Sequence, residues 1–533
     1  MPPQSSLEPF KLIIRSFFAR PRFLAVFARR TRLFFAPQVR ALFSPSRRLP
    51  LALLSAVLTL AITACSHNYY QFPLYTFAGR PIPPSSLGER VLVGYSGNGV
   101  SGGLVILDGL RNLRNNLQNT NTGWSISGYS GSYPSLILSF PEETRGYVYS
   151  NANPYPINSV SYSTESSAGS AGSAGGATNS IAISPDFLRI FAAVEGNGQL
   201  IVIDQQTGGT YSLNLPNVYK VAVNTGDTVA VAMVRNSNTL YRVIKLNTTE
   251  TTVAPPGAAD CEPNILPVYC VVPVPGTYDR PYGATFSLDG SNMYVMNCGQ
   301  ECGGGGNGGA GISIIPQSTL LMNLIPTSTN YPNVVTNTIS VPGGVTDLIS
   351  DGTFLYASGQ KLQPDGLYAG NLTMIPLSTL VAAAPISISD GSHSKMLFAD
   401  DNTLWIGSQY CANGQRAYLA SLGNTTQAAN YNCLTMISLN GTTAPTATVI
   451  PTVNPNVPAN PVPYPNSNQD QFYYGSLTGI CWIQEFHKVY TAYGGQIHAF
   501  NTVDGSEINN ANITIQGTAL DVAYMDALTN TAN

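Results

Sequence analysis

The amino-acid sequence predicts an all-β protein, and three observations lead to that fold class. Charged side chains make up only 10% of the 533 residues, whereas the chain holds 50 glycines and 29 tyrosines. This balance of turn-forming and β-forming residues is poor in helix formers. In addition, short apolar segments alternate with turn residues over most of the chain. The same segment–turn–segment unit returns eight times.

The clearest copy of this unit spans residues 280–297. Its first segment alternates small and apolar residues, and its second contains Tyr294 and Val295. Asp289-Gly290 stands between them, and glycine readily adopts the positive φ that a tight hairpin requires. We therefore expect a β-hairpin here.

Variants of the unit recur with Ser-Pro-Asp, Thr-Gly-Asp, Asp-Gly or Asp-Asn at the turn. Third strands are predicted after two of them, at residues 196–204 and 496–501. The other seven copies comprise five clear ones, at residues 179–195, 219–234, 345–358, 395–408 and 477–492, and two weaker ones that begin at Ser135 and Thr518.

This pattern resembles the YVTN-type β-propeller repeat, in which an inner strand, an Asp-Gly turn, a Tyr-Val-rich strand and a Val-Ile-Asp strand form each blade. The resemblance covers most of residues 90–526. It implies a single β-propeller of seven or eight four-stranded blades, and the count favours eight. A pair of β-sandwiches is the alternative architecture.

The two ends of the repeat region predict how the ring closes. Residues 90–109 read as second and third strands with no inner strand before them, and residues 518–525 read as an inner strand with nothing after it. Pairing the N-terminal and C-terminal strands would complete one blade and remove two free sheet edges.

The N-terminal segment resembles a bacterial lipoprotein signal peptide. Ten basic residues and one acid precede an uncharged run at residues 49–64, which ends in Ile62-Thr63-Ala64-Cys65, similar to a lipobox. That run is shorter than a spanning helix needs. We expect residues 1–64 to be an n-region plus cleaved signal peptide and Cys65 to carry the lipid. An uncleaved anchor is the alternative.

This reading divides the chain into four parts. After the signal peptide come an extended spacer at residues 65–89, the propeller at 90–526 and a tail at 527–533. The long n-region indicates either an upstream-misplaced start codon, which we favour, or an amphipathic segment on the membrane surface. Ser66 after the lipid cysteine favours an outer-membrane anchor over an inner-membrane one, with the domain facing the periplasm or the outside.

The charge of the mature chain excludes one class of partner. Subtracting ten basic residues and one acid from 25 Lys+Arg and 28 Asp+Glu leaves 15 against 27, a net charge of −12. A domain this acidic is a poor binder of nucleic-acid phosphates. We expect a monomer that contacts the membrane through its lipid and an envelope protein or glycan through its surface.

The remaining cysteines fit an oxidising compartment. Proximity suggests three disulfides and leaves Cys481 as a buried thiol. A metal site at residues 298–302 is the alternative, but no second Cys/His pair follows at zinc spacing, so we predict no metal and no cofactor. The predicted pairs are Cys261 with Cys270, Cys298 with Cys302, and Cys411 with Cys433.

Residues for catalysis are scarce. The starts of the predicted inner strands, which line the channel of a propeller, offer a thin set: Arg280, Asp347, His393 and Lys395. An ordinary ion pair or solvated loop charges would equally explain the first two.

Two function classes follow from these observations. The favoured one is a lipid-anchored binding or scaffold module for an envelope protein, peptide or glycan. The alternative is a propeller enzyme of the lactonase, lyase or quinone-dependent dehydrogenase type, acting at the mouth of the channel. Families with this repeat include both kinds, because a fold does not choose its function.

Overall fold

The computed structural model describes fifteen parts of the chain, and those beyond residue 73 belong to one compact unit. The predictions for residues 1–64, for Cys65 and for most of the spacer fall outside the described residues. The described residues are 77, 81–97, 101–114, 123–140, 145–247, 254–263, 266–305, 309–329, 332–364, 368–411, 431–440, 445–450, 477–493, 495–508 and 513–528.

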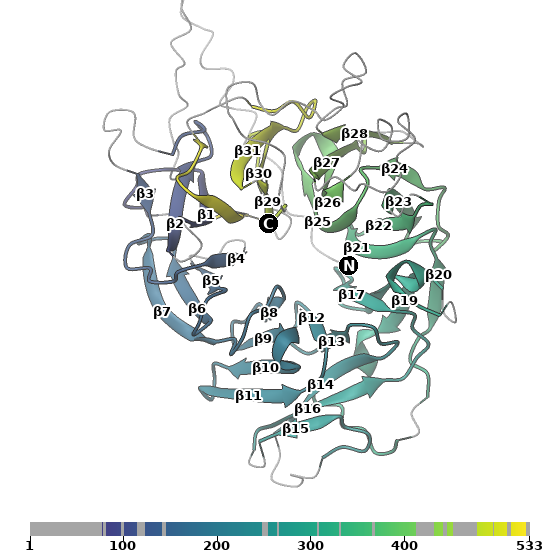
Figure 1. Ribbon diagram of the computed structural model, residues 1–533. Coiled ribbons are helices and arrows are strands. Elements are labelled where there is room, and N and C mark those ends of the chain that lie inside the picture. Colours follow the sequence, from purple (N-terminus) through teal and green to yellow (C-terminus); the bar gives the residue numbers. More distant parts are fainter. Residues whose placement is uncertain are drawn as a thin grey trace, which may run out of the picture. The chain divides into compact units, whose positions relative to one another are not determined.

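Eight antiparallel sheets follow one another around a ring, and the inner strand of each faces the centre (Figure 1). The predicted eight-bladed propeller is therefore confirmed. Each blade takes the name of its inner strand. Written outward from that strand, the first four blades are β4 (Pro134–Ser139), β5 (Arg145–Ser150), β6 (Pro156–Ser161), β7 (Ser166–Ser173); β8 (Ile181–Ile183), β9 (Arg189–Val194), β10 (Gln199–Asp204), β11 (Gly209–Asn214); β12 (Val218–Val223), β13 (Ala230–Val234), β14 (Leu240–Leu246), β16 (Val268–Val274), β15 (Asp260–Glu262); and β17 (Pro281–Phe286), β18 (Asn292–Asn297), β19 (Gly311–Pro316), β20 (Asn337–Ser340).

The next four blades complete the ring. One of them is built from both ends of the repeat region. In the same outward order they are β21 (Gly344–Ser350), β22 (Phe354–Leu362), β23 (Tyr368–Pro376), β24 (Ile386–Ile388); β25 (Ser392–Ala399), β26 (Thr403–Cys411), β27 (Tyr431–Ser438), β28 (Thr446–Ile450); β29 (Gly479–Ile483), β30 (Lys488–Tyr493), β31 (Gln496–Asn501); and β32 (Thr518–Tyr524), β1 (Arg90–Ser96), β2 (Gly102–Asp108), β3 (Trp124–Ser125).

The closing blade confirms the predicted pairing of the two ends. β32 is its inner strand, and β1 pairs with it antiparallel, with Val93 opposite Val522. The guanidinium of Arg90 in β1 also donates to the carboxylate of Asp526 just after β32, at 2.7 Å. This blade therefore joins the N- and C-terminal ends of the repeat region, and the pairing of β1 with β32 covers one edge of each strand.

Two blades depart from the four-stranded pattern. The β12 blade has a fifth strand, β15, whose Cys261 is bonded to Cys270 of β16. The β29 blade has three strands in the described part of the chain, and a single bridge from Phe500 to Glu507 continues it outward. The remaining six blades have four strands each.

Apolar side chains pack between neighbouring blades. Trp405 of the β25 blade, for example, is fully buried with its ring centroid 6.1 Å from that of Phe500 in the β29 blade. Burying such side chains contributes about 2–3 kcal/mol each. The predicted hairpin turn is also present, since Gly290 has a φ of 73° and its N–H bonds to the carbonyl of Ser287.

The described residues contain four short 3₁₀ turns and no α-helix, so none of them forms a helix that could cross a membrane. The 3₁₀ turns are η2 (Glu195–Asn197), η3 (Gly299–Cys302), η4 (Gln317–Thr319) and η5 (Asp400–Asn402).

Cysteine pairing agrees with the sequence where the structure describes the side chains. Cys261–Cys270 and Cys298–Cys302 are disulfides, and Cys481 is a buried thiol whose pKa burial raises. The side chains of the third predicted pair, Cys411 and Cys433, lie outside the described set.

Candidate functional site

A β-bulge near the start of the inner strand recurs around the ring. In six blades one inner-strand residue has no partner on the second strand, so the register shifts by one position. A bulge of this kind re-aims the side chains beside it. The residue that follows the bulge is Leu136, Lys220, Gly283, Asp347 or Lys395, and in the closing blade it is Asp521.

Four of these six positions carry charge, two lysines and two aspartates. Lys220, Asp347 and Lys395 are half-buried. None of the three has an ion-pair partner within 4 Å among the described residues, and the carboxylate of Asp347 accepts only the N–H of Leu348, at 2.9 Å. Asp521 is buried and accepts N–H groups from Ile137 and Val522.

Burial dominates the ionisation of this group of charges. It lowers the pKa of Lys220, although attraction to Asp347 opposes that shift. It raises the pKa of Asp347, against the pull of Lys220 and Lys395. It also raises the pKa of Asp521 to about 6. Lys220 and Asp347 therefore interact without contact, and burial imposes a desolvation cost on Lys220, Asp347 and Asp521.

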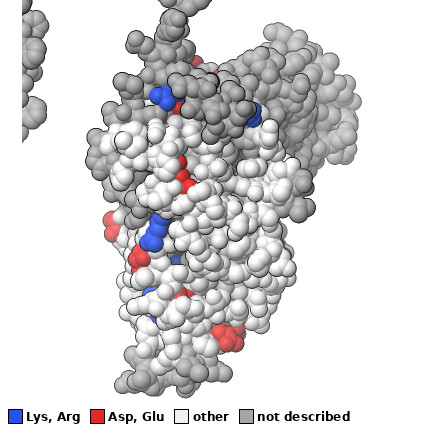
Figure 2. Space-filling model, turned by 90° about the vertical axis from the view of Figure 1, so that its left-hand side faces the viewer, with Lys and Arg blue, Asp and Glu red and all other residues white. Residues whose placement is uncertain are grey.

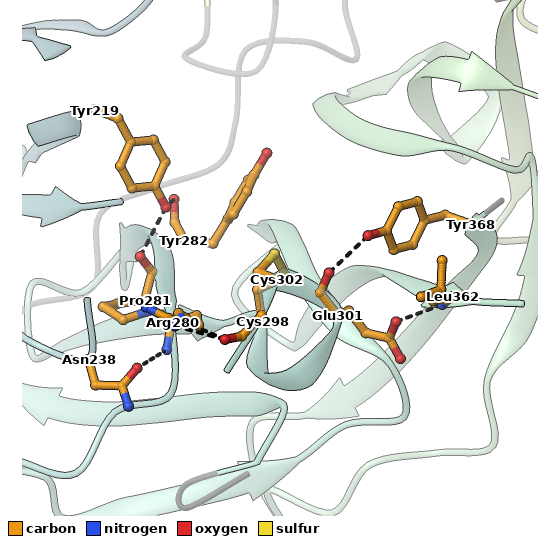
Figure 3. Close-up of a disulfide and its surroundings, with 11 residues drawn as sticks. Tyr219, Asn238, Arg280, Pro281, Tyr282, Cys298, Glu301, Cys302, Leu362 and Tyr368 are labelled. Carbon is orange, nitrogen blue, oxygen red and sulfur yellow. Dashed lines mark hydrogen bonds between the residues drawn. A yellow bond between two sulfur atoms is a disulfide. The ribbon is translucent and has the colours of Figure 1, made fainter. Parts of the chain in front are cut away.

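A cavity of about 230 Å³ lies at the end of the ring where the inner strands begin. Strands of the β12, β17 and β21 blades and the turn η3 surround it (Figure 3). Its walls are mostly polar. They consist of Tyr219, Val234, Arg235, Asn236, Ser237, Arg280, Pro281, Tyr282, Glu301, Cys302, Gln360 and Tyr368.

Two of the tyrosine rings that line the cavity each lie against a cation. The guanidinium of Arg235 lies 4.5 Å from the ring centroid of Tyr219, and the ammonium of Lys220 lies 4.3 Å from that of Tyr282. The two rings meet edge to face with centroids 6.0 Å apart. Arg235 is in addition paired with the carboxylate of Glu195, whereas the described residues give Lys220 no such partner.

Arg280 occupies a strained position at the head of β17. Its φ is 54°, a conformation that suits Gly or Asn, and the preceding blade has Asn217 at the same place before its bulge. The guanidinium donates twice to the carbonyl of Gly303, at 3.1 and 2.7 Å. No carboxylate pairs with Arg280 among the described residues, so the ion pair with Asp347 considered from the sequence does not form.

The disulfide Cys298–Cys302 closes the opposite wall by bracing η3. The side chain of Glu301 in this turn accepts the N–H of Leu362 at 2.6 Å, and its carbonyl accepts the hydroxyl of Tyr368 at 3.1 Å. A side chain at Gly344 would begin 2.5 Å from the carbonyl of Cys298, so only glycine lets η3 pack this closely on β21. The turn thus joins two blades at the rim.

His393 is placed differently from what the sequence predicted. It lies before the bulge of β25 and is fully buried, and its Nε2 lies 2.8 Å from the carbonyl of Ser389. Burial lowers the pKa of His393 to about 4. It is therefore a neutral packing residue, and of the predicted channel-mouth residues only Arg280, Asp347 and Lys395 remain candidates.

The sequence reasoning missed Lys220, Tyr282 and Asp521. Aligning the repeats on the bulge, rather than on the turn, would have placed Lys220 and Asp521 in one column with Asp347 and Lys395. Within the described part of the chain, no cluster of three His, Cys, Asp or Glu residues could hold a metal ion.

Comparison with known proteins found similarity only to solved structures of distant sequence. No family model and no curated protein matches it. Similar solved structures include the dihydro-heme d1 dehydrogenase NirN in complex with DHE, with 12% identity, 84% of this chain and 79% of that chain covered, and a TM-score of 0.48. A putative 6-phosphogluconolactonase from Bacteroides uniformis matches with 12% identity, coverage of 82% and 99%, and a TM-score of 0.41. The Swd1 propeller domain of Myceliophteria thermophila has 10% identity, coverage of 70% and 98%, and a TM-score of 0.41.

Proposed function

We propose that this protein is a binding module of the bacterial cell envelope, which takes a polar ligand into the cavity between the β12, β17 and β21 blades. The observation that carries the proposal is the convergence of Tyr219, Tyr282, Tyr368 and Arg280 on one cavity from three blades. Aromatic rings with a few placed polar groups are typical of ligand sites. Glycans and peptide segments both suit such a lining.

The roles of the ionisable side chains favour binding over catalysis. Glu301 and Arg280 are held by backbone groups of the rim, and His393 is buried and neutral. A general acid or base needs a group that is free to exchange protons with a substrate. The pattern instead supports a preformed receptor.

The envelope location rests on the sequence and on the disulfides. Two disulfides in the described part of the chain suit an oxidising compartment, and Cys65 follows the lipobox-like segment. We propose a lipid anchor at Cys65, most simply in the outer membrane. Intact mass spectrometry of membrane-extracted protein tests this: a chain that starts at Cys65 with added acyl groups supports it, and an unprocessed N-terminus refutes it.

Replacing Tyr282 tests the binding site itself. Ligands are screened by calorimetry against a panel of oligosaccharides and peptides, and Tyr282→Ala is expected to weaken any hit about tenfold or more, because stacking and desolvation at the cavity wall are lost. Tyr241→Ala, in β14 away from the cavity, is the matched control. A hit with the same affinity for both variants would place the site elsewhere.

A second candidate is a propeller enzyme that works at the same mouth. The observation that favours it is the half-buried Lys220, whose ammonium lies 4.3 Å from the ring centroid of Tyr282 and whose pKa is lowered by burial. Turnover of a bound ligand that disappears in Lys220→Met would support this candidate over simple binding.

A further inference from the structure

We propose that the disulfide Cys298–Cys302 is a redox switch of the ligand cavity. A dithiol that reduces this disulfide releases the wall formed by η3 and thereby lowers the affinity for the ligand. The proposal rests on the proposed function and adds the regulation of that same site. Its evidence is the position of the disulfide, which closes a turn that holds lining residues of two blades (Figure 3).

The turn η3 provides hydrogen-bond acceptors to residues on both of its sides. The carbonyl of Gly303, just after the turn, accepts from Nε and a terminal nitrogen of Arg280, at 3.1 and 2.7 Å. The carbonyl of Glu301 accepts the hydroxyl of Tyr368 at 3.1 Å, and its carboxylate accepts the N–H of Leu362 at 2.6 Å. Because Arg280 and Tyr368 both line the cavity, a displacement of η3 would change two of its walls together.

The chain that leaves the turn adds little restraint of its own. Cys302 is followed directly by three glycines, residues 303–305, and glycine has the largest backbone freedom of all residues. The N–H groups of Gly303 and Gly304 donate to carbonyls of the turn, both at 2.9 Å, but a 3₁₀ turn this short is held only weakly by its own hydrogen bonds. The S–S bond is therefore the covalent restraint at this end of η3.

The packing of the turn on β21 depends on the closed disulfide. A Cβ at Gly344 would lie 2.7 Å from the sulfur of Cys298 and 2.9 Å from the Cβ of Glu301, so bare backbone of β21 lies against the turn. Two thiol sulfurs without a bond between them must move apart to van der Waals contact. Because Cys298 is fully buried, we expect the sulfur of Cys302 to move toward the cavity on reduction.

The same sulfur is the accessible one. Cys302 is half-buried and lines the cavity, so a small dithiol can reach it from there. A thiolate of the dithiol attacks the sulfur of Cys302, the S–S bond breaks, and Cys298 leaves with the electron pair and takes up a proton. The second thiol then displaces Cys302, so that the dithiol is oxidised to its disulfide and the two cysteines are reduced to thiols.

The disulfide Cys261–Cys270 is placed differently. Its two residues face each other in the ladder of β15 and β16, where Glu262 pairs with Tyr269 beside them. Backbone hydrogen bonds between the strands remain when such a bond is reduced. The described lining of the cavity includes neither cysteine. This disulfide is therefore the matched control.

Gathered charge offers no comparable control on the side of the ring that Figure 2 shows. Lys and Arg side chains are few and scattered over the described surface there, as are Asp and Glu. Salt acts most strongly where charges of one sign gather. Reduction of a covalent bond needs no such patch.

Hydrogen exchange at Leu362 tests the proposal without a ligand. Its N–H bonds to the carboxylate of Glu301, so its exchange rate reports whether η3 is held against the β21 blade. In the folded full-length protein, dithiothreitol should speed this exchange about tenfold or more, and reoxidation with oxidised glutathione should restore the slow rate. Native mass spectrometry of the same samples verifies which disulfides are reduced.

Two double variants locate the response. Cys261→Ser with Cys270→Ser should keep the response of Leu362 to dithiothreitol, because Cys298–Cys302 is intact. Cys298→Ser with Cys302→Ser should show fast exchange at Leu362 with or without the reductant. Thermal unfolding shows that both variants are folded. A response to dithiothreitol that persists in the second variant would arise elsewhere and would overturn the proposal.

Binding separates this proposal from the proposed function. An oligosaccharide or peptide whose binding depends on Tyr282 should bind about tenfold or more weakly to the reduced protein, because the preformed wall is lost. If its affinity is unchanged although exchange at Leu362 is faster, the control of binding is wrong and the binding site stands.

Two other outcomes are decisive. If dithiothreitol does not reduce Cys298–Cys302 in the folded protein, or leaves exchange at Leu362 unchanged, the switch is refuted whatever the protein binds. If exchange responds but no ligand depends on Tyr282, the proposed function is wrong and the opening of the wall on reduction stands by itself.

Discussion

Two lysines of the same blade, Lys245 and Lys220, differ in whether a carboxylate contacts the ammonium group. Lys245 in β14 is buried between blades, 2.8 Å from the carboxylate of Asp204, with the ring of Tyr269 beside it. Lys220 in β12 is half-buried at the channel and has no carboxylate in contact among the described residues. A contact partner therefore offsets the burial of Lys245, whereas the burial of Lys220 is a cost without such an offset.

The same contrast separates the aspartates. Burial alone would raise the pKa of Asp204, but hydrogen bonds from Lys245 and Tyr269 hold it below its usual value. Burial raises the pKa of Asp521 to about 6, because its partners are backbone N–H groups and Lys395 only at a distance. The inter-blade pair of Asp204 with Lys245 therefore stabilises the fold, whereas the burial of Asp521 beside its bulge costs desolvation free energy without a contacting cation to offset it.

Removing the inter-blade lysine should have the largest effect. Lys245→Met leaves the carboxylate of Asp204 buried with Tyr269 as its remaining side-chain donor. The free energy of unfolding should fall by about 3–5 kcal/mol, as measured by denaturant unfolding. If the variant instead unfolds at the same denaturant concentration as wild type, the inter-blade pairs do not support the ring.

The pH dependence of stability should show the second effect. Because the folded pKa of Asp521 lies above its unfolded value, the folded state holds this proton to higher pH, so the stability it confers is present below about pH 4 and lost as pH rises through about 6. The loss amounts to about 3 kcal/mol. Asp521→Asn should flatten the fall between pH 4 and 6 in unfolding experiments.

Asp204 is a control because its pKa is shifted in the opposite direction to that of Asp521, so its contribution to stability should change with pH in the opposite sense. Its lowered pKa gives stability that is present above about pH 4 and lost at lower pH, so Asp204→Asn should be least destabilising in acid. Asp227, whose pKa burial raises to about 6, keeps part of the fall between pH 4 and 6 in either variant. Equal pH profiles for wild type and Asp521→Asn would contradict the assignment.

The smallest effect on stability is expected at the channel lysine. Lys220→Met keeps the aliphatic stem and removes the desolvated charge, so the free energy of unfolding should stay the same or rise by up to about 1 kcal/mol. Thermal melting beside Lys245→Met measures the difference directly. A loss of more than about 2 kcal/mol would make Lys220 a structural residue like Lys245, and the comparison would fail.

Much of the fold could be read from the sequence because each repeat carries its own hairpin. The Asp289-Gly290 turn and its variants set blade after blade, and the unmatched strands at the two ends predicted closure. Cys261 and Cys270 could be paired because so little chain separates them. These features depend on residues that are neighbours along the chain.

The site could be predicted only in part, because a bulge changes which face a residue occupies. His393 and Lys395 are two positions apart and would share a face in a regular strand, yet the register shift between them leaves His393 buried and Lys395 half-buried. Register shifts of the same kind in β12 and β32 explain why Lys220 and Asp521 were not predicted from the sequence. A period-two pattern cannot show an extra residue that pairs with nothing.

By itself the sequence determined the strand units, their number, the closure of the ring, two disulfides and the sparse charge of the chain. Only the tertiary structure decided which charges are paired and which are open. That choice depends on contacts between blades, such as Lys245 with Asp204, and on a cavity whose walls come from the turn η3 and from the β12, β17 and β21 blades. Electrostatic cost is set by burial and by distance in space, and neither can be read along the chain.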